Sequence, residues 1–160
     1  MGLEIERKFL VQGDAWRDGA TVLAIRQGYL AATESCTVRV RISGESAWLT
    51  IKGKRCNGAT PEFEYAIPLP QAEMMLYTMA RKPLIEKKRH LVAYDGRIWE
   101  VDEFFGDNAG LVLAEIELDS PDETIALPPW AGREVTDEKR FYNANLAGYP
   151  YSHWQENEKS

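Results

Sequence analysis

Alternation between apolar and polar residues is the dominant pattern along this chain. Apolar side chains recur at every second position in short runs, which is the period of a half-buried β-strand. Turn-forming Gly, Pro, Asn and Asp residues separate most of these runs. Strands are therefore predicted at residues 3–11, 25–32, 36–43, 47–54, 62–69, 85–93, 97–105 and 111–119. Short links between most neighbouring runs favour an antiparallel arrangement.

Three stretches break this period and predict helices. Residues 71–80 are rich in Met and Leu and follow a Pro, and residues 120–123 have the sequence of a helix N-cap. Residues 136–147 begin with a capping Thr and precede a Gly. In a chain of 160 residues without repeats or linkers we expect one domain, residues 1–148, followed by a loosely held tail, residues 149–160.

The polar phase of the predicted strands is unusually ionic. Charged residues two positions apart share one face of a strand, with roughly 6–7 Å between their Cα atoms. Many of these pairs carry one sign, such as Arg39 with Arg41 and Glu115 with Glu117. Like charges at close range oppose each other's ionisation, so a purely structural ladder of salt bridges would mix the signs. A solvated face explains any single pair, but the recurrence of the pattern along the chain favours a ligand site.

Eight strands that close into a barrel would place this ionic face inside and the apolar face outside against the helices. The predicted fold is therefore mainly β (α+β), a closed eight-stranded antiparallel barrel with flanking helices. The expected interior carboxylates are Glu4, Glu6, Glu62, Glu64, Glu100, Asp102, Glu115 and Glu117, and the expected interior cations are Lys8, Arg39, Arg41, Lys52, Lys87 and Arg89. Because burying unpaired charge is costly, such an interior must be a wet tunnel that holds metal ions and an anion.

The two sets of charges indicate phosphate chemistry. Carboxylate oxygens without Cys or His suit a hard divalent cation, Mg²⁺ or Mn²⁺, and clustered Arg and Lys neutralise a chain of phosphates. Together they predict metal-assisted phosphoryl transfer. The P-loop sequence GxxxxGK[ST] does not occur in the chain. His90 and His153 lack companion ligands, and Cys36 and Cys56 lack a catalytic His partner, so these four are interpreted as structural or surface residues.

Net charge and composition limit the partners. A formal charge of −6 argues against general binding of nucleic acid. No run approaches the roughly 18 apolar residues that span a bilayer, and the charged N-terminal octapeptide is unlike a signal peptide. Two cysteines without metal-ligand spacing favour a reducing cytoplasm. A homodimer is kept as a hypothesis, because exposed apolar barrel walls often need a second cover.

The ordered motifs resemble a known family. Glu4-Ile5-Glu6-Arg7-Lys8 is similar to the ExExK signature of the CYTH family, the triphosphate tunnel metalloenzymes. Further motifs follow in the family's order at residues 39–41, 50–53, 62–64, 87–89, 99–102, 114–118 and 134–136. One ExExK motif is weak, but the ordered set is specific and covers the chain to about Gly148.

This resemblance implies roles for individual residues. Metal-binding or water-positioning carboxylates would be Glu4, Glu6, Glu115 and Glu117, with Glu62, Glu64 and Asp102 as further candidates. Triphosphate ligands would be Lys8, Arg39, Arg41, Lys52, Lys87 and Arg89, joined by Arg140 from a C-terminal helix that plugs one end of the tunnel. Either Tyr29 or Lys87 would accept a proton.

Four functions remain open at this point. Hydrolysis of inorganic tripolyphosphate is favoured, because the small chain leaves little room for a nucleoside pocket. The alternatives are a class IV adenylate cyclase, a thiamine or nucleoside triphosphatase, and a non-catalytic polyphosphate-binding module. The acidic pairs argue against the last, since a module that only binds an anion has no reason to retain carboxylates that repel it.

Overall fold

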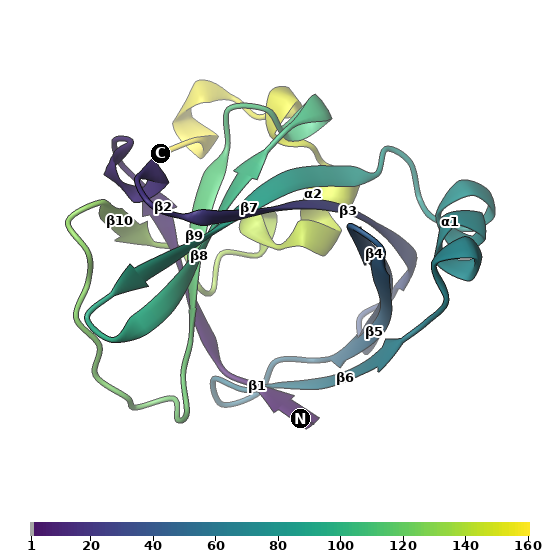
Figure 1. The fold of residues 1–160 in the computed structure, drawn as a ribbon, viewed down its shortest axis with the longest axis horizontal. Coiled ribbons are helices and arrows are strands. Elements are labelled where there is room, and N and C mark those ends of the chain that lie inside the picture. Colours follow the sequence, from purple (N-terminus) through teal and green to yellow (C-terminus); the bar gives the residue numbers. More distant parts are fainter. Residues whose placement is uncertain (1) are drawn as a thin grey trace.

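A computed structural model describes residues 2–160 and contains one ten-stranded antiparallel sheet that curls into an incomplete ring (Figure 1). The strands are β1 (Gly2–Glu4), β2 (Glu6–Val11), β3 (Thr21–Ala32), β4 (Cys36–Ser43), β5 (Ser46–Gly53), β6 (Thr60–Ala66), β7 (Ile85–Tyr94), β8 (Arg97–Phe104), β9 (Val112–Glu117) and β10 (Ala131–Glu134). Hydrogen-bonded neighbours follow the order β1-β6-β5-β4-β3-β7-β8-β9-β2-β10. Most strands therefore pair with the next one along the chain, as the short links predict.

Helices are few and short. The α-helices are α1 (Leu69–Thr78) and α2 (Asn143–Gly148), and the 3₁₀ turns are η1 (Ala15–Arg17), η2 (Gly106–Asn108), η3 (Lys139–Phe141), η4 (Tyr151–His153) and η5 (Glu156–Glu158). None of the helices within residues 2–160 is long and apolar enough to cross a membrane.

Tight turns fix the register of the hairpins. Tyr94 pairs with Arg97 across the two-residue turn between β7 and β8. Both turn residues, Asp95 and Gly96, have positive φ angles, of 49° and 75°. This backbone matches the right-handed twist of the flanking strands, and Asp-Gly is a sequence that adopts it readily. The register then keeps the charged residues of both strands on one face.

The predicted closed barrel of eight strands is wrong in strand number and in closure. The single strand expected at residues 3–11 is interrupted at Ile5, and its two parts pair at opposite ends of the sheet. β1 pairs with β6 and β2 pairs with β9. The ring is therefore joined at this point by the covalent chain and not by a continuous ladder of hydrogen bonds. The alternation of residues 3–11 continues through Ile5, so periodicity gave no sign of the break.

Strand β10 was not predicted. It pairs with the outer edge of β2 in an irregular register, Ala131 opposite Val11 and Glu134 opposite Phe9. Its sequence, Ala-Gly-Arg-Glu, has no apolar alternation. This strand forms because β2 offers a free edge beyond β9, which is a tertiary cause.

Two predicted helices are also corrected. Residues 120–123 form a turn, in which the backbone N–H of Asp119 donates to Glu123 Oε1 at 2.7 Å. Residues 136–147 divide into η3 and α2. Thr136 does not cap a helix, because its hydroxyl accepts a hydrogen bond from the backbone N–H of Lys8 at 3.0 Å. Pairing with β2 therefore replaces the predicted first helical turns. The helix expected at residues 71–80 is present as α1, shifted by two residues.

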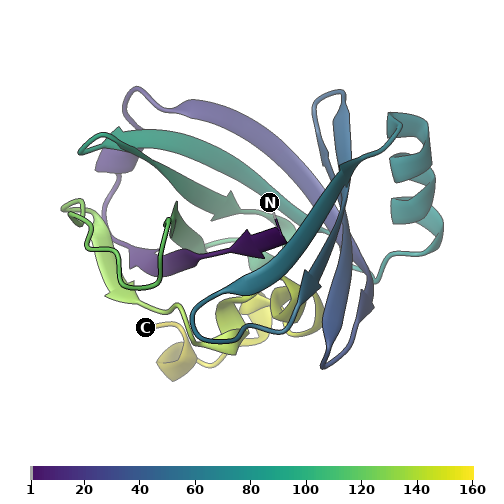
Figure 2. The ribbon, with the colours of Figure 1, turned by 90° about the horizontal axis from the view of Figure 1, so that it is seen from below.

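Two of the three apolar clusters formed by residues 2–160 lie outside the ring, as the predicted orientation requires, and the remaining one closes one end of it. Helix α1 packs outside β3, β4 and β5, whereas the C-terminal segment packs across one end of the ring (Figures 1 and 2). There it covers apolar residues such as Ile85 and Leu113, which share a strand face with Lys87 and Glu115. The close approach of α1 requires Gly28, since a Cβ atom there would lie 3.0 Å from Leu76 Cδ2 in α1 and 2.8 Å from the Cβ of Ala80, just beyond the helix. A third cluster contains Trp16, Trp99 and Trp130, packed against β2, β8 and β9. Burial of the α1 and tryptophan clusters outside the ring, and of the C-terminal cluster at one end, leaves the rest of the inner face for charged residues.

The C-terminal segment is packed, contrary to the prediction of a loosely held tail. Trp154 is 5% exposed and belongs to the cluster that contains Phe141 and Leu146. Its ring meets that of Phe141 edge-on, with 5.1 Å between centroids, and its Nε1 donates to the backbone oxygen of Tyr149 at 3.0 Å. Residues 149–160 therefore help to hold α2 against the sheet.

We expect Trp154→Ala to lower the free energy of unfolding by about 3–5 kcal/mol, because it empties a packed site and removes a hydrogen bond. Urea denaturation followed by far-UV circular dichroism measures this change. Tyr77→Ala is the control, since the Tyr77 side chain is 82% exposed, and it should change stability by less than about 0.5 kcal/mol. Equal stabilities for both variants would contradict a structural role for the C-terminal segment.

Candidate functional site

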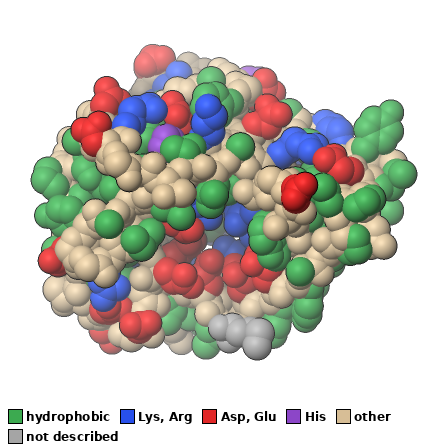
Figure 3. Space-filling view, viewed as in Figure 1, with side chains coloured by type: hydrophobic (Ala, Val, Ile, Leu, Met, Phe, Trp, Pro, Cys, Tyr) green, Lys and Arg blue, Asp and Glu red, His purple; other side chains and the backbone are tan. Residues whose placement is uncertain are grey.

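The curled sheet surrounds a cavity of about 360 Å³ that opens on the face seen in Figure 3. Acidic and basic side chains gather on opposite sides of this opening (Figure 3). The strands contribute Glu4, Glu6, Lys8, Tyr29, Thr37, Arg39, Arg41, Lys52, Gly53, Thr60, Glu62, Glu64, Lys87, Arg89, Glu100, Glu115 and Glu117 to the lining, and other segments contribute Arg55, Thr136, Tyr142, Asn143 and Ala144. The sheet thus brings together most of the residues predicted for the site.

The charges are segregated by strand into two arcs. Around the ring, β5, β4, β3 and β7 are adjacent and carry most of the cations, which we call the basic arc: Lys52, Arg39, Arg41, Lys87 and Arg89. The other strands continue from β8 through β9 and the N-terminal strands to β6, and they carry the acidic arc: Glu100, Glu115, Glu117, Glu4, Glu6, Glu62 and Glu64. Lys8 on β2 is the exception. The break at Ile5 lies within the acidic arc.

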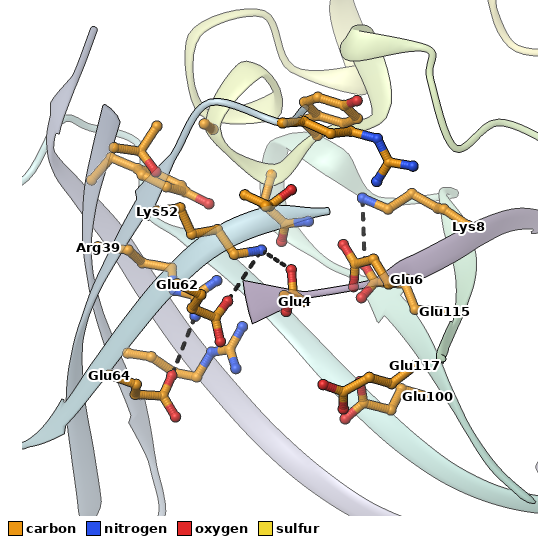
Figure 4. Close-up of a pocket in the computed structure, with 18 of the residues that line it drawn as sticks. Glu4, Glu6, Lys8, Arg39, Lys52, Glu62, Glu64, Glu100, Glu115 and Glu117 are labelled. Atoms are coloured by element: carbon orange, nitrogen blue, oxygen red, sulfur yellow. Dashed lines mark hydrogen bonds and ion pairs between the residues drawn. The ribbon is translucent and has the colours of Figure 1, made fainter. Parts of the chain in front are cut away.

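Ion pairs form where the two arcs meet. At the junction of β5 and β6, Lys52 Nζ lies 2.6 Å from Glu4 Oε1 and 3.4 Å from Glu62 Oε2 (Figure 4). At the junction of β7 and β8, Arg89 Nη1 lies 3.1 Å from Glu100 Oε2. These pairs compensate the charges at the edges of each arc. Within the acidic arc, Lys8 Nζ lies 3.4 Å from Glu115 Oε1 and compensates that carboxylate as well (Figure 4).

The middle of the basic arc is prepared for an anion. Burial, together with the charges of Arg39 and Arg89, lowers the pKa of Arg41 to about 10. The Nε atom of Arg39 is buried and has no hydrogen-bond partner within residues 2–160. Buried guanidinium groups need acceptors, and phosphate oxygens provide them in the matching planar geometry.

The middle of the acidic arc has the opposite property. Burial and the nearby charges of Glu115 and Glu4 raise the pKa of Glu6 well above its ordinary value. For Glu115, burial also opposes ionisation, but the charges of Lys8, Arg89 and Lys87 outweigh it and hold its pKa well below the ordinary value. A positive charge placed between the two carboxylates would relieve their repulsion.

Asp102 lies behind the cavity wall and not on it. Its carboxylate accepts hydrogen bonds from Lys87 Nζ at 2.8 Å and from Arg89 Nε and Nη2 at 2.8 and 3.0 Å. It is 1% exposed and is absent from the cavity lining. Asp102 therefore orients two cations of the basic arc. Burial, opposed by Asp102 and reinforced by Arg89 and Arg41, lowers the pKa of Lys87 to about 7.

Arg140 does not reach the cavity. Its Nη2 lies 3.1 Å from Glu138 Oε1, and its guanidinium stacks over the rings of Phe141 and Trp154. The 3₁₀ turn η3, in place of the predicted helix, directs this side chain to the C-terminal cluster. Tyr29, by contrast, lies on the cavity wall and is 6% exposed.

Several lining residues escaped the sequence analysis. Arg55 lies beyond β5, and its Nε is 3.4 Å from Asp137 Oδ1. Tyr142 and Asn143 come from the C-terminal segment. None of these belongs to an alternating strand, so no periodic signal could have placed them inside.

The acidic arc has the donor chemistry for a hard divalent cation. Its carboxylate oxygens are the ligands that Mg²⁺ and Mn²⁺ prefer. Burial and the negative charges of Glu115 and Glu4 raise the pKa of Glu6, and a bound cation would compensate those charges. Within residues 2–160, no group of three or more His, Cys, Asp or Glu side chains already converges on a metal position. The residues therefore fit a metal by type and charge, and the carboxylates would have to reorient to ligate it.

The fold and the cavity define a class of protein, a curled antiparallel sheet that encloses opposed arcs of basic and acidic side chains. The sequence model of the CYTH domain matches residues 2–143. The chain therefore belongs to the CYTH domain family, and the resemblance seen in the ordered motifs is confirmed.

Related proteins share most of the chain. Over 156 residues it is 44% identical to an inorganic triphosphatase of Acetivibrio thermocellus, which covers 98% of this chain and 100% of that protein. It is 38% identical over 149 residues to an inorganic triphosphatase of Nitrosomonas europaea, across 90% of this chain and 96% of the relative. The solved structure of the inorganic triphosphatase NE1496 superimposes with a TM-score of 0.66 at 38% identity, covering 89% of this chain and 96% of that one.

We expect Glu6→Gln to stabilise the fold at pH 8 more than at pH 4. The folded-state pKa of Glu6 lies above the ordinary 4.5, so wild-type stability falls as the pH rises from about 4.5 through the folded-state value. Glutamine does not ionise, and each unit of pKa shift that is removed corresponds to about 1.4 kcal/mol.

Urea denaturation at both pH values, in the presence of EDTA, measures this difference. Glu45→Gln in the exposed turn between β4 and β5 is the matched control, and it should show no comparable dependence on pH. The interpretation of Glu6 fails if Glu6→Gln changes stability equally at pH 4 and pH 8.

Proposed function

We propose that the protein hydrolyses inorganic tripolyphosphate to pyrophosphate and phosphate with the help of Mg²⁺ or Mn²⁺. The observation that carries this proposal is the separation of charge in the cavity, with a basic arc facing an acidic arc. A metal-bound polyphosphate has both signs of charge and fits between the two. The names of the relatives at 44% and 38% identity support the same reaction.

The basic arc would bind the phosphate chain. Its members are Arg39, Arg41, Lys52, Lys87 and Arg89, and Lys8 adds one cation from β2. Arginine donates in a planar fork to two phosphate oxygens, and lysine supplies a compact charge. A cavity of about 360 Å³ is in the range of small-molecule sites, and most of its lining residues are charged or polar.

The acidic arc would hold the metal ion. Glu4, Glu6, Glu115 and Glu117 are the ligands that we propose, and Glu100 lies beside Glu115 in the register of β8 and β9. A bound divalent cation would neutralise charge on the phosphate oxygens and lower the pKa of a water molecule.

Some predicted metal ligands serve other groups. Asp102 is not among the proposed metal ligands, because its two oxygens accept hydrogen bonds from Lys87 and Arg89. Glu62 lies 3.4 Å from Lys52 Nζ, but Glu4 lies closer to the same atom, at 2.6 Å, so this contact does not exclude Glu62 as a further metal ligand. Glu64 accepts a hydrogen bond from Thr50 at 2.8 Å. Glu62 and Glu64 also lie near cations of the basic arc, Lys52 and Arg39, and we keep them as further candidate ligands.

Lys87 and Tyr29 are the groups that we propose for proton transfer. Both lie on the cavity wall within the basic arc, so both would face the phosphate chain. A pKa near 7 allows Lys87 Nζ either to hold or to release a proton at neutral pH. Water attack on the terminal phosphorus needs such a group close to the nucleophile.

The first test is incubation of the purified protein with Mg²⁺ or Mn²⁺ and, separately, with tripolyphosphate, ATP and thiamine triphosphate. We expect phosphate release from tripolyphosphate to exceed that from the other two substrates, and EDTA should abolish it. Formation of cyclic AMP would instead identify a cyclase. Binding of tripolyphosphate without turnover would identify a binding module and overturn the proposal.

Arg41→Ala is expected to lower kcat/KM for tripolyphosphate by roughly 10²-fold, because it removes a buried cation from the middle of the basic arc. Steady-state phosphate release measures the loss. Arg26→Ala is the matched control, since Arg26 lies on neighbouring β3 but forms an ion pair with Glu73 outside the ring, at 2.6 Å. Arg26→Ala should retain activity within about 2-fold of wild type, and a similar loss in both variants would disprove the role of the inner face.

A further inference from the structure

One strand of the basic arc contributes no cation to the cavity. β3 lies between β4 and β7, and at this level its inward residue is Gln27. Gln27 is 0% exposed, so its amide must be hydrogen-bonded to offset the cost of burial. Its Oε1 accepts from Arg41 Nε at 2.9 Å, and its Nε2 donates to Asn143 Oδ1 at 2.9 Å. A neutral amide thus sits among the charged groups with both ends engaged.

Asn143 joins this amide to Lys87. Its Oδ1 accepts hydrogen bonds from both Gln27 Nε2 and Lys87 Nζ, each at 2.9 Å. The orientation of both amides follows from their partners, since a flipped amide would set its NH₂ group against the N–H donors of Arg41 or Lys87. A continuous chain of hydrogen bonds therefore runs from Arg41 through Gln27 and Asn143 to Lys87.

The chain leaves the cations able to bind a ligand. Lys87 has three N–H donors, and only two of them are used, by Asp102 and Asn143. Arg41 uses Nε for Gln27, and its Nη donors make no hydrogen bond within residues 2–160. An amide oxygen fixes Arg41 without cancelling its charge, and it adds a second, neutral acceptor to Lys87 beside the Asp102 carboxylate. A carboxylate in the same place would form an ion pair and compete with phosphate.

The same chain connects the cavity to the C-terminal segment. Asn143 is the first residue of α2, a helix that is not part of the sheet and that contacts β3 and β7 (Figure 1). The position of α2 therefore determines the position of Asn143 Oδ1, which accepts the hydrogen bond from Lys87 Nζ. Figure 4 shows the C-terminal coil above the charged side chains of the cavity.

We propose that Gln27 and Asn143 are positioning residues, which hold Arg41 and Lys87 toward the phosphate chain and link their placement to the docking of α2. The inference rests on the proposed triphosphatase function. Neither residue has a charge or a nucleophile, and each accepts a hydrogen bond from the cation that it positions.

The test compares Asn143→Leu with Asn145→Leu, its control on the same helix. Asn145 is exposed and donates to the backbone oxygen of Lys139, without a contact to Lys87. We expect Asn143→Leu to lower kcat for tripolyphosphate by about 10- to 100-fold, since small displacements of a catalytic group have effects of this order. Asn145→Leu should stay within about 2-fold of wild type. Equal kcat and KM values for the two variants would overturn the proposal.

A second comparison separates positioning from a general structural defect. In a Lys87→Met background, Asn143→Leu should change kcat by less than about 2-fold, because the group that it positions is gone. Gln27→Met combined with Asn143→Leu should likewise lose less than the product of the two single losses. If the loss in kcat of a double variant equals the product of the two single losses, Asn143 acts independently of the other residue in that pair.

A measurement without turnover keeps the inference separate from the proposed function. The ¹⁵Nζ resonance of Lys87, compared at one pH between wild type and Asn143→Leu, reports the lost hydrogen bond directly. If Asn143→Leu does not fold, Asn143→Ser is used, since its hydroxyl is too short to replace the bridge. If Asn143→Leu shifts this resonance but the wild-type protein does not hydrolyse tripolyphosphate, the bridge is supported and the proposed function is rejected. An unchanged resonance would overturn the bridge.

Discussion

Like charges held together on the inner face of a curled sheet are the constraint on which the rest of this structure depends. Arg41 and Glu6 lie at the centres of the two arcs, and burial beside charges of the same sign shifts the pKa of each toward its neutral form. Such groups oppose folding, because each would be better solvated in the unfolded chain. The arrangement persists because the arcs compensate each other at their edges and because stability is supplied elsewhere.

That stability comes from the outer surface of the ring and from the apolar cluster that closes one end of it. Aromatic side chains such as Trp99 and Trp154 pack beneath loops and the C-terminal segment, and α1 covers the outside of β3, β4 and β5. A sheet usually buries its apolar face in one central core. Here the curl separates the two tasks, so hydrophobic burial lies outside the ring and at its covered end, and the charged side chains line the remaining cavity. This separation explains why a chain of 160 residues holds so many charged side chains in one cavity.

The break in the strand at Ile5 also shapes the acidic arc. β1 and β2 both carry inward glutamates, and they pair with strands at opposite ends of the sheet. Glu6 lies opposite Glu117, and Lys8 lies opposite Glu115. Covalent continuity holds the acidic arc together across this point without a ladder of hydrogen bonds between β6 and β9. The arc can therefore gather carboxylates from both ends of the sheet around one position.

Periodicity alone determined which residues face inward. Two-residue spacing identified both arcs, from Arg39 and Arg41 to Glu115 and Glu117, because side-chain direction in a strand follows directly from position. The ordered motifs likewise determined the family. Neither source could place residues outside the alternating strands, which is why Arg55, Tyr142 and Asn143 were missed.

Only the tertiary structure decided how the strands join and how the charges are shared. Whether a strand continues past Ile5 depends on which neighbours are within reach, and β10 exists because β2 has a free edge. Asp102 has the inward spacing of a ligand, yet Lys87 and Arg89 occupy its oxygens. Sequence spacing fixes the face of a strand on which a side chain lies. The partners that it meets there depend on the curl of the whole sheet, since those partners come from distant parts of the chain.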